Sequence, residues 1–162
     1  MRYFPVAPLM AFCCFAQNGA EAATATGTFN VQVTIAATCV VTSATNLNFG
    51  TQGVLAANVD QTSTINVTCT NTTPYNIGLD QGVNGGSVTT RQMKAAGPAL
   101  INYSLFSDAG RTVNWGQTIG TDTVAATGTG SAQPLTVFGR IPPQPSPLPA
   151  VYNDTITVTV TY

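Results

Sequence analysis

Residues 155–162 read Thr155-Ile156-Thr157-Val158-Thr159-Val160-Thr161-Tyr162, with strict alternation between polar and apolar side chains. Successive side chains of a β-strand point to opposite faces, so a period of two indicates a strand with one buried face. The apolar face of this predicted strand carries Ile156, Val158, Val160 and Tyr162. The threonines occupy the opposite face. The stretch therefore favours an all-β domain.

A second segment with the same period lies near the other end of the chain. Its apolar positions are Phe29, Val31, Val33 and Ile35, which alternate with Asn30, Gln32 and Thr34. The pattern predicts a second core strand. It does not decide whether that strand completes its own domain or another molecule's, because the same alternation serves either role.

The composition narrows the class of protein. The chain has 162 residues, enough for one domain with a real core, and only five basic and six acidic side chains, with a net charge of −1. Threonine, valine, asparagine and glycine suit strands and turns better than long surface helices. The basic residues are scattered, which argues against a nucleic-acid partner.

Residues 1–22 are predicted to be a signal peptide. Arg2 supplies a positive charge, residues 3–16 are almost wholly apolar, and Ala20-Glu21-Ala22 has the small-x-small pattern that signal peptidase requires. Cleavage is expected near 22/23. The apolar run is too short to span a membrane and is interrupted by prolines. We therefore expect an exported protein.

Two cysteines, Cys39 and Cys69, remain after the signal peptide is removed. An oxidising compartment makes a disulfide between them the default expectation. Closing a loop of about thirty residues would stabilise the fold by roughly 3 to 4 kcal/mol in the chain-entropy model. A metal or redox site is disfavoured, because the chain has no histidine and only these two thiols in its mature part.

Short runs of apolar alternation recur along the chain, separated by turn residues such as Asn-Gly-Gly and Pro. They predict strands at 28–41, 46–49, 63–70, 75–80, 100–107, 132–140 and 151–162, with weaker candidates at 88–94 and 111–115. Several short strands at this spacing indicate a β-sandwich. The proline-rich residues 141–149 predict an extended loop, since proline cannot occupy a central strand.

Residues that would support catalysis are scarce. Histidine is absent and the single lysine of the chain lies in no nucleophile motif. The mature acidic residues lie singly in or beside predicted turns: Asp60, Asp80, Asp108, Asp122 and Asp154. No catalytic, cofactor-binding or metal-binding residue is predicted. The remaining enzymatic alternative is a pair of aspartates from distant loops that meet in space, as in glycosidases.

Several short motifs, in their order along the chain, resemble the spore coat protein U domain family. They are the alternating segment that leads to Cys39, then Leu47-Asn48-Phe49-Gly50, Ile65-Asn66-Val67-Thr68-Cys69, residues 101–106 followed by Asp108 and Arg111, residues 137–142, and residues 152–160. The resemblance covers nearly the whole mature chain. The family comprises subunits of archaic chaperone-usher pili in Gram-negative bacteria, together with related secreted coat proteins.

The resemblance implies an incomplete immunoglobulin-like β-sandwich that is completed by a donor strand. It assigns residues 23–36 to an N-terminal donor-strand segment and 37–162 to the sandwich domain. The implied donor residues are Phe29, Val31, Val33 and Ile35. The implied acceptor groove, which a chaperone would also contact, is lined by Ile156, Val158, Val160 and Tyr162.

The same resemblance implies a structural subunit of a surface fibre, exported through the periplasm and supporting adhesion and biofilm formation. The implied partners are a periplasmic pilus chaperone, an outer-membrane usher and neighbouring pilus subunits. No cofactor is implied. Two alternatives stay open: a secreted coat protein that folds its own first strand into the groove, and a carbohydrate- or receptor-binding adhesin module.

Overall fold

The computed structural model describes Gly19 and residues 21–162, so most of the expected signal peptide lies outside the described residues. The chain divides into two compact units, residues 1–34 and residues 35–162. No helix occurs in the described part of the chain. Within it, therefore, no helix has the length and apolar character needed to cross a membrane.

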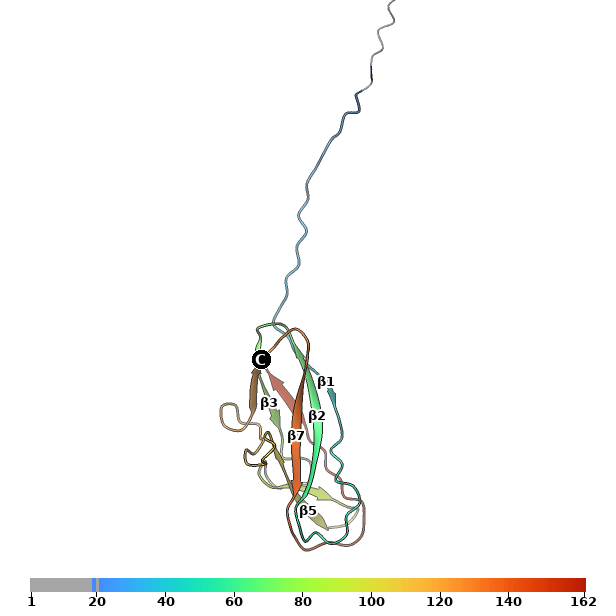
Figure 1. Cartoon of the computed structure of the whole chain (residues 1–162), viewed down its shortest axis with the longest axis vertical. Coiled ribbons are helices and arrows are strands. Elements are labelled where there is room, and N and C mark those ends of the chain that lie inside the picture. The colour runs from blue at the N-terminus through green and yellow to red at the C-terminus, as the bar shows by residue number, and fades with distance from the viewer. Residues whose placement is uncertain (1–18, 20) are drawn as a thin grey trace, which may run out of the picture. The chain divides into compact units, whose positions relative to one another are not determined.

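Residues 35–162 form an all-β domain of two antiparallel sheets (Figure 1). Five strands make the larger sheet, in the order β1-β2-β7-β5-β4, and three make the smaller, in the order β6-β3-β8. Their bounds are β1 Cys39–Ala44, β2 Val59–Cys69, β3 Pro74–Leu79, β4 Arg91–Lys94, β5 Leu100–Phe106, β6 Val124–Thr127, β7 Ala132–Ile141 and β8 Val158–Thr161. The predicted sandwich class is confirmed.

The core lies between the two sheets, where alternate residues of facing strands meet. From the larger sheet β2 contributes Ile65 and Val67, and from the smaller sheet β3 contributes Ile77 and Leu79, all fully or almost fully buried. Trp115, in the segment after β5, is buried in the same core, and its indole N–H donates to the Ile77 carbonyl at 2.8 Å. Burying this polar atom is tolerated because it has a hydrogen-bond partner.

The structure confirms strands near the predicted positions 63–70, 75–80, 100–107, 132–140 and 88–94. Two predictions were wrong, since residues 46–49 and 111–115 form no strand. Phe49 is nevertheless buried in the core, and Asn114 makes an isolated bridge to Phe106. Burial of Phe49 and of Trp115 in the core accounts for one apolar residue in each segment without a ladder, whereas Val113 is 52% exposed.

The predicted strand at 28–41 is also corrected, because only its last three residues belong to β1, which begins at Cys39. The described residues ahead of Cys39 form no strand. A strand requires backbone hydrogen bonds to a neighbour, whereas alternation specifies only the faces. Similarly, β8 is shorter than the predicted 151–162, since pairing with β3 covers Val158–Thr161 alone.

The proline-rich segment after β7 is a loop, as predicted. Gln144 fixes this loop to the sandwich because its side-chain amide bonds to both backbone groups of one residue in β5, as a neighbouring strand would. Its carbonyl oxygen accepts from the Asn102 N–H at 3.0 Å and its amide donates to the Asn102 carbonyl at 2.8 Å. The loop thus adds two hydrogen bonds to β5 without forming a strand.

Candidate functional site

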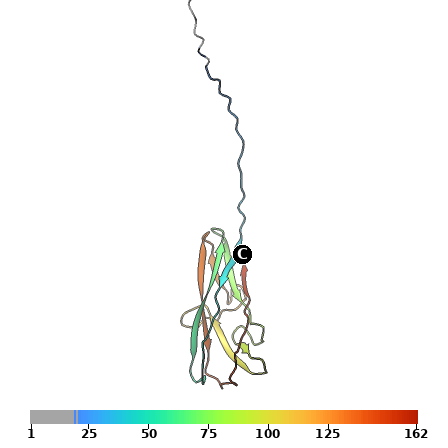
Figure 2. The ribbon, with the colours of Figure 1, turned by 90° about the vertical axis from the view of Figure 1, so that its right-hand side faces the viewer.

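Strands β1 and β8 are the exposed edges of their respective sheets, and they lie next to each other at one side of the sandwich. Each pairs with only one neighbour, β1 with β2 and β8 with β3, and no ladder joins the two in the described residues. Figures 1 and 2 show the C-terminus, just after β8, at the same end of the sandwich as the start of β1. We call the gap between these two edges the open seam.

The inner side of the open seam is apolar. Ile156, Val158 and Val160 are half-buried and pack against the core, while the alternating threonines 155–161 are exposed. Val41 of β1 packs against the same core from the other side. Tyr162 is 58% exposed. An unpaired edge with apolar side chains beside it is a template for strand addition and a liability for aggregation.

The start of β8 is held by Asp80, which directly follows β3. One carboxylate oxygen of Asp80 accepts from the Thr157 N–H at 2.9 Å and from the Gly82 N–H at 3.0 Å, and the Asp80 N–H donates to the Thr157 carbonyl. Burial acts to raise the pKa of Asp80, but these hydrogen bonds and the charge of Arg91 outweigh it and lower that pKa. Asp80 therefore acts as an ionised clamp on the strand that borders the seam.

A second aspartate, Asp154, fixes the segment that leads into β8. Its carboxylate accepts from the Tyr103 hydroxyl at 2.7 Å, the Val83 N–H at 3.0 Å and the Asn84 amide at 2.9 Å. Burial and this bond to a carboxylate together raise the pKa of Tyr103. The tyrosine therefore stays neutral and donates its proton to the bond.

Arg91 contacts the backbone of Asp80 and is fully buried. Its guanidinium donates to the carbonyls of Leu79, Asp80, Val88 and Trp115, at distances from 2.6 to 3.0 Å. Burial lowers its pKa, and neighbouring acidic groups, including Asp80, oppose that effect. A buried charge with several hydrogen-bond partners specifies how the end of β3 meets the loops around it.

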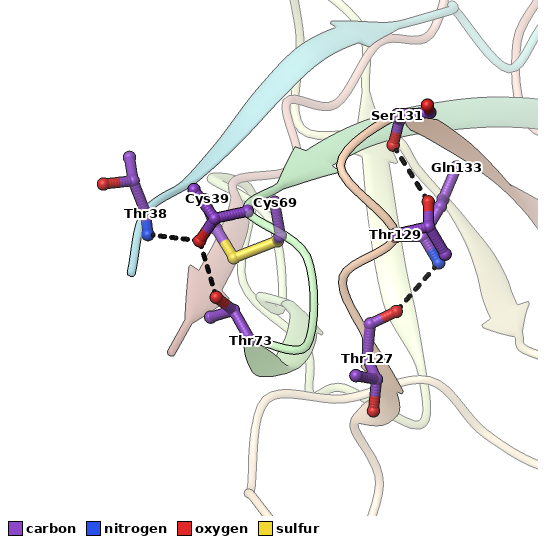
Figure 3. Close-up of a disulfide and its surroundings, with 9 residues drawn as sticks. Thr38, Cys39, Cys69, Thr73, Thr127, Thr129, Ser131 and Gln133 are labelled. Carbon is purple, nitrogen blue, oxygen red and sulfur yellow. Dashed lines mark hydrogen bonds between the residues drawn. A yellow bond between two sulfur atoms is a disulfide. The ribbon is translucent and has the colours of Figure 1, made fainter. Parts of the chain in front are cut away.

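The other edge of the seam is fixed by the Cys39–Cys69 disulfide, which is present as expected (Figure 3). The two cysteines face each other directly across the β1–β2 ladder. Hydrogen bonds among three threonines add to this attachment. The Thr38 N–H donates to the Thr70 hydroxyl at 3.1 Å, and that hydroxyl is hydrogen-bonded to the Thr73 hydroxyl at 2.6 Å. The beginning of β1 is therefore attached firmly to β2.

The predicted donor residues are strongly exposed to solvent. Phe29, Val31 and Val33 are 80–86% exposed, and Ile35, the first residue of the second unit, is 75% exposed. Large apolar side chains with this exposure are costly in water, and a regular alternating set of them is suited to burial in a partner.

The five aspartates that left an enzymatic alternative open each have structural partners. Asp60 forms a bidentate ion pair with Arg140 and also contacts Arg111. Asp108 and Asp122 accept backbone N–H groups within their own turns. Asp80 and Asp154 hold the start of β8, as described above. Residues 21–162 contain no group of three or more His, Cys, Asp or Glu side chains placed to hold a metal ion.

The sequence pointed to the β8 side of the open seam alone, and it gave no indication of Val41 on the β1 side or of the residues that support β8. Val41 could have been found from its place two residues after Cys39, which puts both side chains on one face. Arg91 and the clamping role of Asp80 gave no signal, because their partners come from segments far apart in the chain.

Comparisons with known proteins agree with this architecture. Residues 25–159 match the Spore Coat Protein U domain family. The chain is 32% identical to Protein U of Myxococcus xanthus over 158 residues, covering 88% of each protein.

A solved structure shares the fold. It is a chain in the crystal structure of the CsuC-CsuE chaperone-tip adhesion subunit pre-assembly complex from archaic chaperone-usher Csu pili of Acinetobacter baumannii, with a TM-score of 0.55 and 24% identity. The similarity covers 80% of this chain but 40% of that one, so this chain spans less than half of its length. The family match over residues 25–159 and the 32% identity to Protein U show that the chain belongs to the Spore Coat Protein U domain family.

Proposed function

We propose that the protein is a structural subunit of a surface fibre of the archaic chaperone-usher type, assembled by donor-strand exchange. Residues 26–35 of one copy are added as a strand in the open seam of the next copy. The donor's apolar residues enter the seam beside Ile156, Val158, Val160 and Tyr162. Residues 1–22 are a signal peptide, 23–36 the donor segment and 37–162 the acceptor domain.

One observation carries this proposal: an unpaired edge with apolar side chains beside it and an exposed alternating segment occur in the same chain. The domain has two neighbouring unpaired edges with an apolar floor, and the described residues ahead of Cys39 contain an exposed alternating segment without a strand partner. Burying Phe29, Val31, Val33 and Ile35 contributes roughly 6 to 12 kcal/mol before ordering costs. That is comparable with the stability of a whole domain, so such a junction can hold a fibre without covalent bonds.

The open seam also accounts for the partners we propose. A subunit with a free apolar edge aggregates unless the edge is covered, so a periplasmic chaperone holds it before assembly. The solved structure that shares this fold is a chaperone-tip adhesion subunit pre-assembly complex. An outer-membrane usher then passes the subunit to the growing fibre at the cell surface, where the fibre supports adhesion and biofilm formation. No catalytic step is required.

The test is electrophoresis in SDS of purified surface material without boiling. Exchange between copies predicts a ladder of oligomers that collapses to one band on boiling. A variant that lacks residues 26–35 serves as the control and should give no ladder. A single unboiled monomer band from the full chain would contradict the proposal and favour a coat protein that completes its own domain. A separate receptor-binding activity would instead favour an adhesin.

A further inference from the structure

A shallow depression of about 370 Å³ lies where the chain enters β1, outside the open seam. Its lining includes Ile35, Thr38 and Val40 from the start of the domain and Thr68 and Thr70 from the end of β2. No charged side chain lines it. Val40 points away from the core, since its neighbours Cys39 and Val41 point inward, and it is 48% exposed.

The length of chain between the donor segment and this depression is short and fixed at one end. Thr38 is attached to Thr70 by two hydrogen bonds, from the Thr38 N–H to the hydroxyl at 3.1 Å and from the Thr70 N–H to the Thr38 carbonyl at 2.9 Å. Only Ala36 and Ala37 are therefore free between Ile35 and Thr38. Three extended residue steps span at most about 11 Å.

This short link places a neighbour beside the depression, if the proposed donor exchange is accepted. When Ile35 enters the seam of a second copy, the rim of that seam lies within about 11 Å of Thr38. Thr38 lines the depression, so the rim of the second copy's seam lies within about 11 Å of this surface. Moving Ile35 into the seam also removes its side chain from the depression and leaves an apolar surface to be covered.

We propose that the depression around Val40 is a docking surface for a second copy of this chain, namely the one that receives its donor strand. This contact is additional to strand addition. It fixes the angle between successive domains of the fibre, whereas a two-residue link alone would leave that angle free. The absence of charge in the lining suits an apolar rim rather than an acidic or basic partner.

The experiment compares full-length fibres of three chains: unchanged, Val40→Asp and Val113→Asp. Val113 is a matched control, because it is also a valine, is 52% exposed and lies outside the depression. The angle between successive domains is measured in electron micrographs, and the unboiled SDS ladder is recorded for each chain. We expect all three ladders to persist, with the spread of angles increased about twofold for Val40→Asp only, as expected when a small interface is lost.

The outcomes separate this inference from the proposed function. Equal angular spread in Val40→Asp and unchanged fibres, with both ladders intact, would overturn the docking surface alone. Loss of the ladder in Val40→Asp, with a folded and disulfide-bonded monomer, would also overturn it, because the residue would then belong to the exchange itself. Absence of a ladder from the unchanged chain would overturn donor exchange.

Discussion

Residues 29–35 and 156–162 have the same period-two pattern, yet they lie in different environments. Ile156, Val158 and Val160 are half-buried against the core, and part of their segment forms β8 through pairing with β3. The side chains of Phe29, Val31, Val33 and Ile35 are 75–86% exposed, and no strand forms there. Alternation therefore determines which side chains share a face, and a partner edge determines whether that face is buried.

The difference explains how one chain can both supply and require a strand. β8 is satisfied along one edge and open along the other, and the N-terminal segment is open along both. Under the proposed donor exchange, polymerisation joins the two kinds of open edge. Each experiment below alters one of the two segments or its support, and the expected effects decrease from the first to the last.

The largest effect is expected from Val33→Asp. A charge placed in an apolar seam without a partner costs several kcal/mol, so fibre assembly should fail. The monomer should stay folded with its disulfide, because the acceptor domain is unaltered. Fibre yield by electron microscopy and periplasmic subunit level measure the two effects. Gln32→Asp, on the opposite face of the same segment, is the control and should still assemble.

Normal fibres from Val33→Asp would show that this segment is not the donor. Loss of the folded monomer would show instead that the segment completes its own domain. Either result would remove the proposed distinction between the two alternating segments.

Removal of the disulfide by combined Cys39→Ala and Cys69→Ala tests the β1 side of the seam. The chain-entropy model for a thirty-residue separation gives a loss of about 3 to 4 kcal/mol in the free energy of unfolding. Denaturant unfolding of the monomer, compared with the unchanged protein with and without reductant, measures this loss. Uptake of two alkyl groups by the unreduced protein would contradict the bond.

Val158→Asp tests the β8 side. The side chain is half-buried against the core, so a carboxylate there should lower the free energy of unfolding by about 2 to 3 kcal/mol and weaken chaperone capture. Thr159→Asp, on the exposed face of the same strand, should have little effect on either. Equal loss from both variants would mean that β8 does not present one face to the core.

The smallest effect is expected at the clamp on the start of β8. The pKa of Asp80 is lower in the folded protein than its unfolded value of about 3.9, so its stabilisation is present above that pH and is lost as the pH falls through the folded pKa. Asp80→Asn should reduce the free energy of unfolding at pH 7 by about 1 kcal/mol, because asparagine keeps a carbonyl acceptor and loses only the difference between a charged and a neutral hydrogen bond. The difference from the unchanged protein should shrink below about pH 4. A difference that is constant between pH 7 and pH 3 would contradict the clamp.

Much of the fold could be predicted because strands with one buried face leave a period of two in the sequence, as at Ile65 and Val67 or Ile77 and Leu79. β6 was missed because its small residues Ala125 and Ala126 give no alternation. The disulfide followed from the count of cysteines and the expected export. Arg91 could not be predicted, since its four carbonyl partners are brought together only by the fold.

Hydrogen exchange of the backbone amides of residues 29–35 tests the central proposal most directly. It should be measured in chaperone-released monomer and in assembled fibres. Donor exchange between copies predicts fast exchange of these amides in the monomer and slow exchange in the fibre, where they are bonded to the seam of the next copy. Slow exchange in the monomer, or fast exchange in the fibre, would contradict the account.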